Sequence, residues 1–176
     1  MKTLLYIAAL WCSHTLVGQT SITFAGETGA MLVQPFTTDK TPLSIGGQFK
    51  LDWRSRGTAY RFAEFGIDKF RFVWQDTKKD FSFTYLRLTT GWRMYPGGTY
   101  GMYAEMGLGA FGLITDGYSS GDDALHLGAG VSPGFGYAGK SLCIGIQLPV
   151  HLTAYAGIGV NPTIHAGFHI VPKSAR

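Results

Sequence analysis

Residues 142–170 alternate strictly between two kinds of side chain, and this pattern limits the possible folds more than any other feature of the sequence. Apolar residues occupy every second position of 142–152 and of 158–170, and small or polar residues stand between them. Successive side chains of a β-strand point to opposite faces, so a period of two predicts two strands, each with one apolar face. The apolar set is Leu142, Ile144, Ile146, Leu148, Val150, Leu152, Ile158, Val160, Pro162, Ile164, Ala166, Phe168 and Ile170.

The same signal recurs along the chain and predicts an all-β fold of eight antiparallel strands. Glycine-containing tight turns are expected at 95–99 and 138–140, and longer polar loops at 35–42, 75–79 and 115–123. Two of the strands, 59–74 and 80–95, carry apolar residues on both faces, which fits either β-bulges or strand ends that rise above a membrane. The expected strands are 22–33, 43–54, 59–74, 80–95, 100–114, 124–138, 140–154 and 158–171.

Alternation alone fits both a soluble sandwich, with its apolar faces inside, and an up-and-down membrane barrel, with its apolar faces outside. The strands are about 12 residues long, whereas strands of soluble domains are usually about 5 to 6 residues and a bilayer needs about 9 to 11. Aromatic residues near the strand ends are typical of the girdles of a transmembrane β-barrel. The expected girdle residues are Trp53, Tyr60, Trp92, Tyr95, Tyr100 and Tyr137.

The N-terminus has the features of an export signal. Lys2 precedes an apolar run at 4–11 that is too short to span a bilayer, and a polar segment follows it. We therefore expect a removable signal peptide at 1–18 and a single barrel domain at 19–176. Cys12 would leave with the signal, so the mature chain would keep one thiol, at Cys143, and no internal disulfide.

An eight-stranded barrel is just wide enough for side chains to fill its interior, so no open pore is expected. Acidic and basic residues occur in comparable number on the inward faces, as a buried charge network requires. Glycines at 128, 130, 134 and 136 leave room along one wall, into which long Lys and Arg side chains could reach. The predicted interior network is Glu27, Lys50, Asp52, Arg87, Arg93 and Glu105, accompanied by Gln48, His126, Gln147, His151, His165 and His169.

The export signal, eight alternating strands, short inner turns and charged interior together resemble the small outer-membrane β-barrels, such as the OmpA transmembrane domain and OmpX. The resemblance covers the whole expected mature chain. It implies a monomer in the outer membrane of a Gram-negative bacterium, in contact with membrane lipid and lipopolysaccharide. The likeness is architectural, because no motif transfers a specific function, and the tail 172–176 does not end on the aromatic residue typical of these barrels.

The sequence favours a non-enzymatic barrel with a structural or interaction role through its outer loops. Two alternatives remain open: a lipid A-modifying outer-membrane enzyme, and a secreted soluble barrel that binds an apolar ligand. His126 and Ser132 are about 20 Å apart along a strand, too far for a catalytic pair, and His165 and His169 are too far apart to share a metal ion. No catalytic residue, cofactor or metal site is therefore predicted, and the scattered net charge of +4 gives no case for nucleic acid.

Overall fold

The computed structural model describes residues 20–33, 42–56, 58–73, 80–98, 100–116, 124–153 and 157–171. Every regular element in these ranges is a β-strand, and no helix among them is long and apolar enough to cross a bilayer. The expected signal peptide and most of the three long loops lie outside the described residues. The strands are β1 (Thr20–Ala30), β2 (Leu32–Val33), β3 (Leu43–Arg56), β4 (Ala59–Val73), β5 (Asp80–Met94), β6 (Gly101–Asp116), β7 (Ala124–Ala138), β8 (Leu142–Gln147), β9 (Val150–Thr153), β10 (Gly157–Val160) and β11 (Thr163–Ile170).

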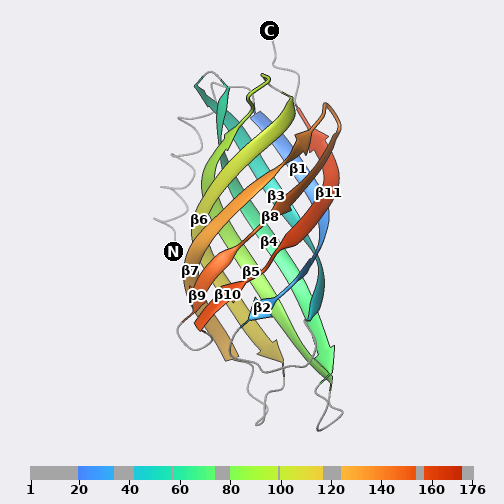
Figure 1. Cartoon of the computed structure of the whole chain (residues 1–176), viewed down its shortest axis with the longest axis vertical. Helices are drawn as coiled ribbons and strands as arrows, with labels where there is room; N and C mark the ends of the chain where they lie inside the picture. Colours follow the sequence, from blue (N-terminus) through green and yellow to red (C-terminus); the bar gives the residue numbers. More distant parts are fainter. Residues whose placement is uncertain are drawn as a thin grey trace, which may run out of the picture.

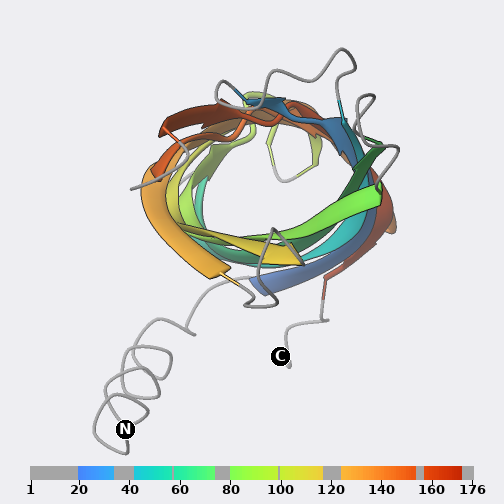
Figure 2. The same ribbon diagram turned by 90° about the horizontal axis from the view of Figure 1, so that it is seen from below.

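These eleven segments form one closed barrel of eight antiparallel strands, as the sequence predicts. Three barrel strands are interrupted, so that β1 and β2, β8 and β9, and β10 and β11 each form one strand. The barrel closes because β1 pairs with β11, while β8 pairs with both β7 and β11. Figure 1 shows β1 and β11 side by side although they come from opposite ends of the chain, and Figure 2 shows the closed ring along its axis.

The barrel wall has its apolar side chains on the outside. On β8 the alternation separates exposed Leu142, Ile144 and Ile146 from buried Cys143 and Gln147. The same division continues around the barrel, and many of the buried interior side chains are polar or charged. Large outward-facing apolar residues include Phe24, Ile45, Phe65, Leu88, Leu108, Leu127, Phe135, Leu152, Ile158, Ile164 and Phe168.

The mixed faces of β4 and β5 arise without a bulge between these two strands, because their ladder is continuous from Ala59–Met94 to Val73–Asp80. Aromatic side chains on their inward faces belong to two apolar clusters. One apolar cluster at the end that leads to the long loops combines residues of four barrel strands: Met31, Phe70, Phe83, Tyr85, Phe111 and Leu113. A second cluster at the turn end contains Tyr60, Tyr95, Tyr103, Ala138 and Cys143.

Two residues of the predicted girdle point inward, which corrects that prediction. Tyr60 and Tyr95 are only 4% and 2% exposed, and their rings meet edge to face with centroids 5.3 Å apart. The physical reason is strand parity: Tyr60 shares the inward face of β4 with Phe62, and Tyr95 follows inward-facing Arg93 by two residues. Both tyrosines therefore belong to the interior.

The other predicted girdle residues lie toward the turn end of the barrel. Trp92 and Tyr137 are each 51% exposed on the outer face, and Trp53 and Tyr100 are half-buried. The tight turns at this end match the prediction: Gly98 donates its amide to the carbonyl of Tyr95 at 3.2 Å and has a φ of 119°, which glycine tolerates.

Candidate functional site: the charged barrel interior

All six residues of the predicted interior network have buried side chains. They come from β1, β3, β5 and β6, and none is more than 5% exposed. Because burying an unpaired charge is costly, the arrangement of their partners decides whether the interior is stable. The residues are Glu27, Lys50, Asp52, Arg87, Arg93 and Glu105.

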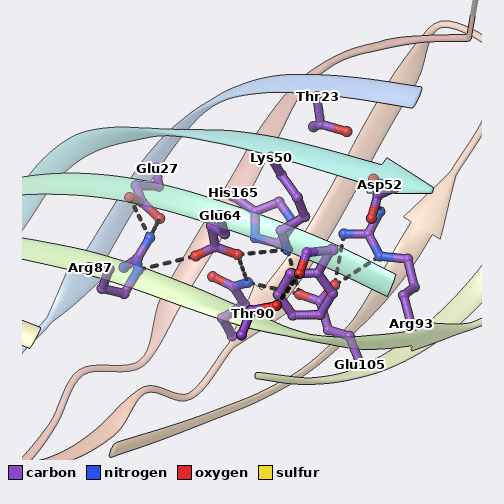
Figure 3. Close-up of polar contacts among 12 residues, drawn as sticks. Thr23, Glu27, Lys50, Asp52, Glu64, Arg87, Thr90, Arg93, Glu105 and His165 are labelled. Atoms are coloured by element: carbon purple, nitrogen blue, oxygen red, sulfur yellow. Dashed lines mark hydrogen bonds and ion pairs between the residues drawn. The ribbon is translucent and has the colours of Figure 1, made fainter. Parts of the chain in front are cut away.

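Arg87 on β5 binds three carboxylates, and we call these four residues the Arg87 cluster. Its Nη2 donates to both carboxylate oxygens of Glu27 at 2.7 Å. Its Nε donates to Oε1 of Glu64 at 3.2 Å, and its Nη1 donates to Oδ2 of Asp68 at 3.0 Å. Figure 3 shows Arg87 between Glu27 and Glu64. One cation therefore ties together strands β1, β4 and β5 across the interior.

Lys50, Asp52, Arg93 and Glu105 form a second group, the Arg93 cluster. Arg93 donates from Nε to Oε2 of Glu105 at 2.8 Å and from Nη1 to Oδ2 of Asp52 at 3.1 Å. Nζ of Lys50 lies 2.8 Å from Oε1 of Glu105. Both cations also lie over aromatic rings, with Lys50 4.7 Å from the centroid of Phe62, a favourable cation–π arrangement.

Glu64 and Gln147 connect the two clusters. Oε2 of Glu64 accepts from Lys50 and from Nε2 of Gln147 at 2.8 Å each, while its other oxygen accepts from Arg87. Nε2 of Gln147 also donates to Glu105 at 2.8 Å. The result is one continuous ionic network, whose dashed contacts are drawn in Figure 3.

Glu64 and Asp68 are two further buried charges that the alternation did not predict. Both are on β4, where apolar residues on each face hide the alternation. The sequence of this segment does indicate that they face inward, because Glu64, Gly66 and Asp68 alternate with the exposed residues Phe65 and Ile67. With these two residues, the described interior holds five buried carboxylates and three buried Lys and Arg side chains.

The glycines of β7 provide room for neighbouring side chains. These are Gln147, Glu105 and Tyr103, not the Lys and Arg side chains that the sequence suggested. A Cβ at Gly134 would lie 3.0 Å from Gln147 and 3.1 Å from Glu105, and one at Gly136 would lie 2.6 Å from the hydroxyl of Tyr103. Arg87 instead lies over Gly66 of β4. Bare backbone on two walls thus makes space for bulky interior groups.

The interior histidines contact hydroxyl groups. Nδ1 of His151 lies 3.0 Å from the hydroxyl of Tyr85, and Nε2 of His165 lies 3.0 Å from that of Tyr103. Thr23 contacts His169 at 3.0 Å. The hydroxyl of Ser132 has no hydrogen-bond partner among the described residues, and within those residues no group of three or more His, Cys, Asp or Glu side chains could hold a metal ion.

No protein-family model and no curated protein matches the sequence. Solved structures of small outer-membrane barrels do match the fold. Ail of Yersinia pestis, in complex with the heparin analogue sucrose octasulfate, is 16% identical with a TM-score of 0.57, and the match covers 87% of this chain and 99% of Ail. Neisserial surface protein A is 11% identical with a TM-score of 0.59, and the match covers 86% of this chain and 96% of that chain.

The N-terminal β-barrel domain of Pseudomonas aeruginosa OprF gives a similar result, with 11% identity, a TM-score of 0.57, and coverage of 87% of this chain and 99% of that domain. At these identities the comparisons establish the fold. The chain has the architecture of the small outer-membrane β-barrels, as its alternating strands predict.

Proposed function

We propose that this protein is a monomeric outer-membrane barrel that is exported by its N-terminal signal and spans the membrane with its eight strands. The observation that carries the proposal is the inverted polarity of the wall, with apolar side chains outside and an ionic network inside. Water would solvate such an outer surface poorly, whereas the hydrocarbon of a bilayer would accept it. A bilayer also requires the backbone N–H and C=O groups to be hydrogen-bonded within the protein, and a closed barrel has no unpaired edge strand.

The interior supports a non-conducting and non-enzymatic role. Side chains of the Arg87 and Arg93 clusters bridge the interior, and an apolar cluster lies at each of its ends. Contacts with other molecules would then be made by the long outer loops expected at 35–42, 75–79 and 115–123, and by the outer surface of the strands. No cofactor is required for such a role.

We further propose that the outer surface binds phosphate groups of membrane lipid or lipopolysaccharide through Lys69 and Arg71. Both side chains are exposed on β4, about 7 Å apart along the strand. Exposed Ile45 and Leu43 stand opposite them on β3, so the two charges adjoin an apolar surface. An anionic lipid with apolar chains would match this combination of side chains.

Cell fractionation with surface proteolysis tests the membrane address and the topology together. The full chain should fractionate with outer membranes, migrate differently after heating, and be cut from outside within the three long loops. Recovery of the folded chain in the soluble periplasm would contradict the membrane proposal and would favour a soluble barrel that binds an apolar ligand.

The lipid contact has a matched control on the same strand. Replacing Lys69 and Arg71 by alanine should weaken binding to vesicles that contain lipopolysaccharide about tenfold or more, and should not change binding to zwitterionic vesicles. Arg61→Ala removes an exposed charge near the opposite end of β4 and should leave lipopolysaccharide binding unchanged. The non-enzymatic role predicts identical lipid A mass spectra with and without the gene, and a changed acyl chain would contradict it.

A further inference from the structure

Arg61 lies on the outer face of the wall between two tryptophans. It is directly opposite Trp53 of β3 on one side and directly opposite Trp92 of β5 on the other. Arg61 and Trp92 are exposed on this outer face, and Trp53 is half-buried. The Cβ atoms of directly opposed residues on one face of a sheet are about 4.5–5.5 Å apart, so an indole side chain starts on each side of the arginine. We call these three residues the Trp–Arg–Trp row.

The row lies at one border of the apolar outer surface. Three uncharged outward-facing residues separate Arg61 from Lys69 on β4. Eight residues at about 3.3 Å each place the two basic residues about 26 Å apart along the strand. Strands of membrane barrels tilt by about 35–45° and their apolar band is about 25 Å tall, so this separation corresponds to about 20 Å in height. Because long basic side chains extend toward the interface, Arg61 marks the membrane border at the turn end, as Lys69 does at the loop end.

The outer surface next to the row, toward the middle of the apolar band, is low and apolar. Ala63 follows Arg61 by two residues on the same face of β4, and Leu51 and Thr90 are directly opposite Ala63 on the neighbouring strands. The hydroxyl of Thr90 donates to the carbonyl of Phe62 at 2.9 Å, so it is already satisfied within the wall. The next exposed row toward the middle is Phe49, Phe65 and Leu88. An alkyl chain that starts beside Arg61 therefore has a path over a small side chain to a large apolar surface.

The charge around the row selects the ligand. All five carboxylates whose burial the structure describes belong to the interior network, and none of them is more than 5% exposed. The ammonium of a zwitterionic headgroup would find no acidic partner among these side chains, whereas an anionic phosphate needs only donors. A guanidinium offers a fork of N–H donors that matches phosphate, and each indole adds one N–H.

We propose that the Trp–Arg–Trp row binds the phosphate of an anionic glycerophospholipid in the membrane leaflet at the turn end. Arg61 holds the phosphate, the two indoles flank the headgroup at the interface, and an acyl chain lies over Ala63. The inference rests on the proposed membrane location. It assigns the two ends of β4 to different lipids, with lipopolysaccharide at Lys69 and Arg71 and phospholipid at Arg61.

Native mass spectrometry of the full chain, folded in detergent micelles with added lipid, tests the site. The unmodified protein should retain phosphatidylglycerol about fivefold more strongly than phosphatidylcholine, and Arg61→Gln should remove this preference. Ala63→Phe keeps the charge but fills the path of the acyl chain, so it should also lower retention of phosphatidylglycerol. Retention that is unchanged in either variant would overturn the proposal.

Lys140→Gln is the matched control. It removes an exposed cation at the same end of the barrel, in the turn that follows β7, three strands from β4. Retention of phosphatidylglycerol should not change, and a loss equal to that of Arg61→Gln would overturn the proposal by showing a general charge effect. The assay does not depend on where the cell places the chain, so recovery of the chain in the soluble periplasm would contradict the proposed function and not the lipid site.

Tryptophan fluorescence gives a second test in a bilayer. Trp11→Phe and Trp74→Phe together leave Trp53 and Trp92 as the only indoles of the chain. In phosphatidylcholine vesicles with a minor share of brominated lipid, brominated phosphatidylglycerol should quench this fluorescence more than brominated phosphatidylcholine does. Adding Arg61→Gln should abolish the difference, while adding Lys69→Ala and Arg71→Ala should preserve it. Equal quenching by both brominated lipids without Arg61→Gln would overturn the proposal.

Discussion

The Arg87 cluster and the Arg93 cluster differ in the number of cations that contact their buried carboxylates. In the Arg87 cluster a single cation contacts Glu27, Glu64 and Asp68. In the Arg93 cluster Arg93 alone contacts Asp52, while Lys50 and Arg93 both contact Glu105. Two acids of the first cluster therefore depend on a single cation, whereas only one acid of the second cluster does.

This difference indicates where the interior is vulnerable. Among the described ion pairs, Arg87 is the only cation that contacts Glu27 or Asp68, so neither acid has a second cation if Arg87 is lost. Glu64 and Glu105 each have two cationic partners and also accept from Gln147. A buried carboxylate that keeps one partner loses far less than one left alone.

Arg87→Met should have the largest effect. It leaves Glu27 and Asp68 buried without a cation, and we expect it to lower the free energy of unfolding by about 3–5 kcal/mol or more. Urea unfolding from lipid vesicles measures the change, and Arg61→Met, at an exposed position, is the control. Adding Glu27→Gln and Asp68→Asn to Arg87→Met should recover part of the loss, and no recovery would contradict this account of the Arg87 cluster.

Arg93→Met should cost less, about 2–3 kcal/mol, measured in the same way. Asp52 loses its cation but lies on the same wall as Ser21, whose hydroxyl is 3.4 Å away, and Glu105 keeps both Lys50 and Gln147. A loss of stability equal to that of Arg87→Met would show that the Arg93 cluster depends on its arginine as much as the Arg87 cluster does.

Lys50→Met should cost about 1–2 kcal/mol, because each of its two carboxylate partners keeps an arginine. The comparison is sharpest in a double-mutant cycle. Lys50→Met and Arg93→Met share Glu105, so their combined loss should exceed the sum of the single losses, whereas two independent sites would give simple addition.

Gln147→Leu should have the smallest effect, a loss of about 1 kcal/mol, since it removes only neutral donors from carboxylates that retain their cations. Its side chain has nearly the same volume, which limits any packing change. A loss as large as that of Arg93→Met would mean that the link between the clusters matters more than the cations themselves.

The alternation of 142–170 was sufficient to predict the outward face, because there the apolar residues keep one parity and the other face is small or polar. On β4 the same rule failed to identify Glu64 and Asp68, since the interior ends in aromatic clusters and Phe70 resembles a lipid-facing residue in sequence. Tyr60 and Tyr95 were misplaced for a related reason: a tyrosine suits both an interface and a barrel interior, and only strand parity decides between them.

Other features depend on register between distant strands and are not visible in the sequence. Pro42, Pro133, Pro149 and Pro162 are far apart in sequence, and only the strand pairing places their carbonyls opposite amides of the neighbouring strands. Similarly, the contact between His151 and Tyr85 joins residues 66 positions apart. Local patterns define which way a side chain faces, whereas its partner is set by the closure of the barrel.

The bare inner wall of β7 makes this barrel a convenient starting point for engineering. Glycines at 128, 130, 134 and 136 add no side-chain volume, so the interior side chains come largely from the other strands. Trimming a few of those residues, in charge-balanced sets, would open a tube along β7 without altering a single outward-facing position. The same scaffold could then be tuned for conductance while its apolar outer surface stays unchanged.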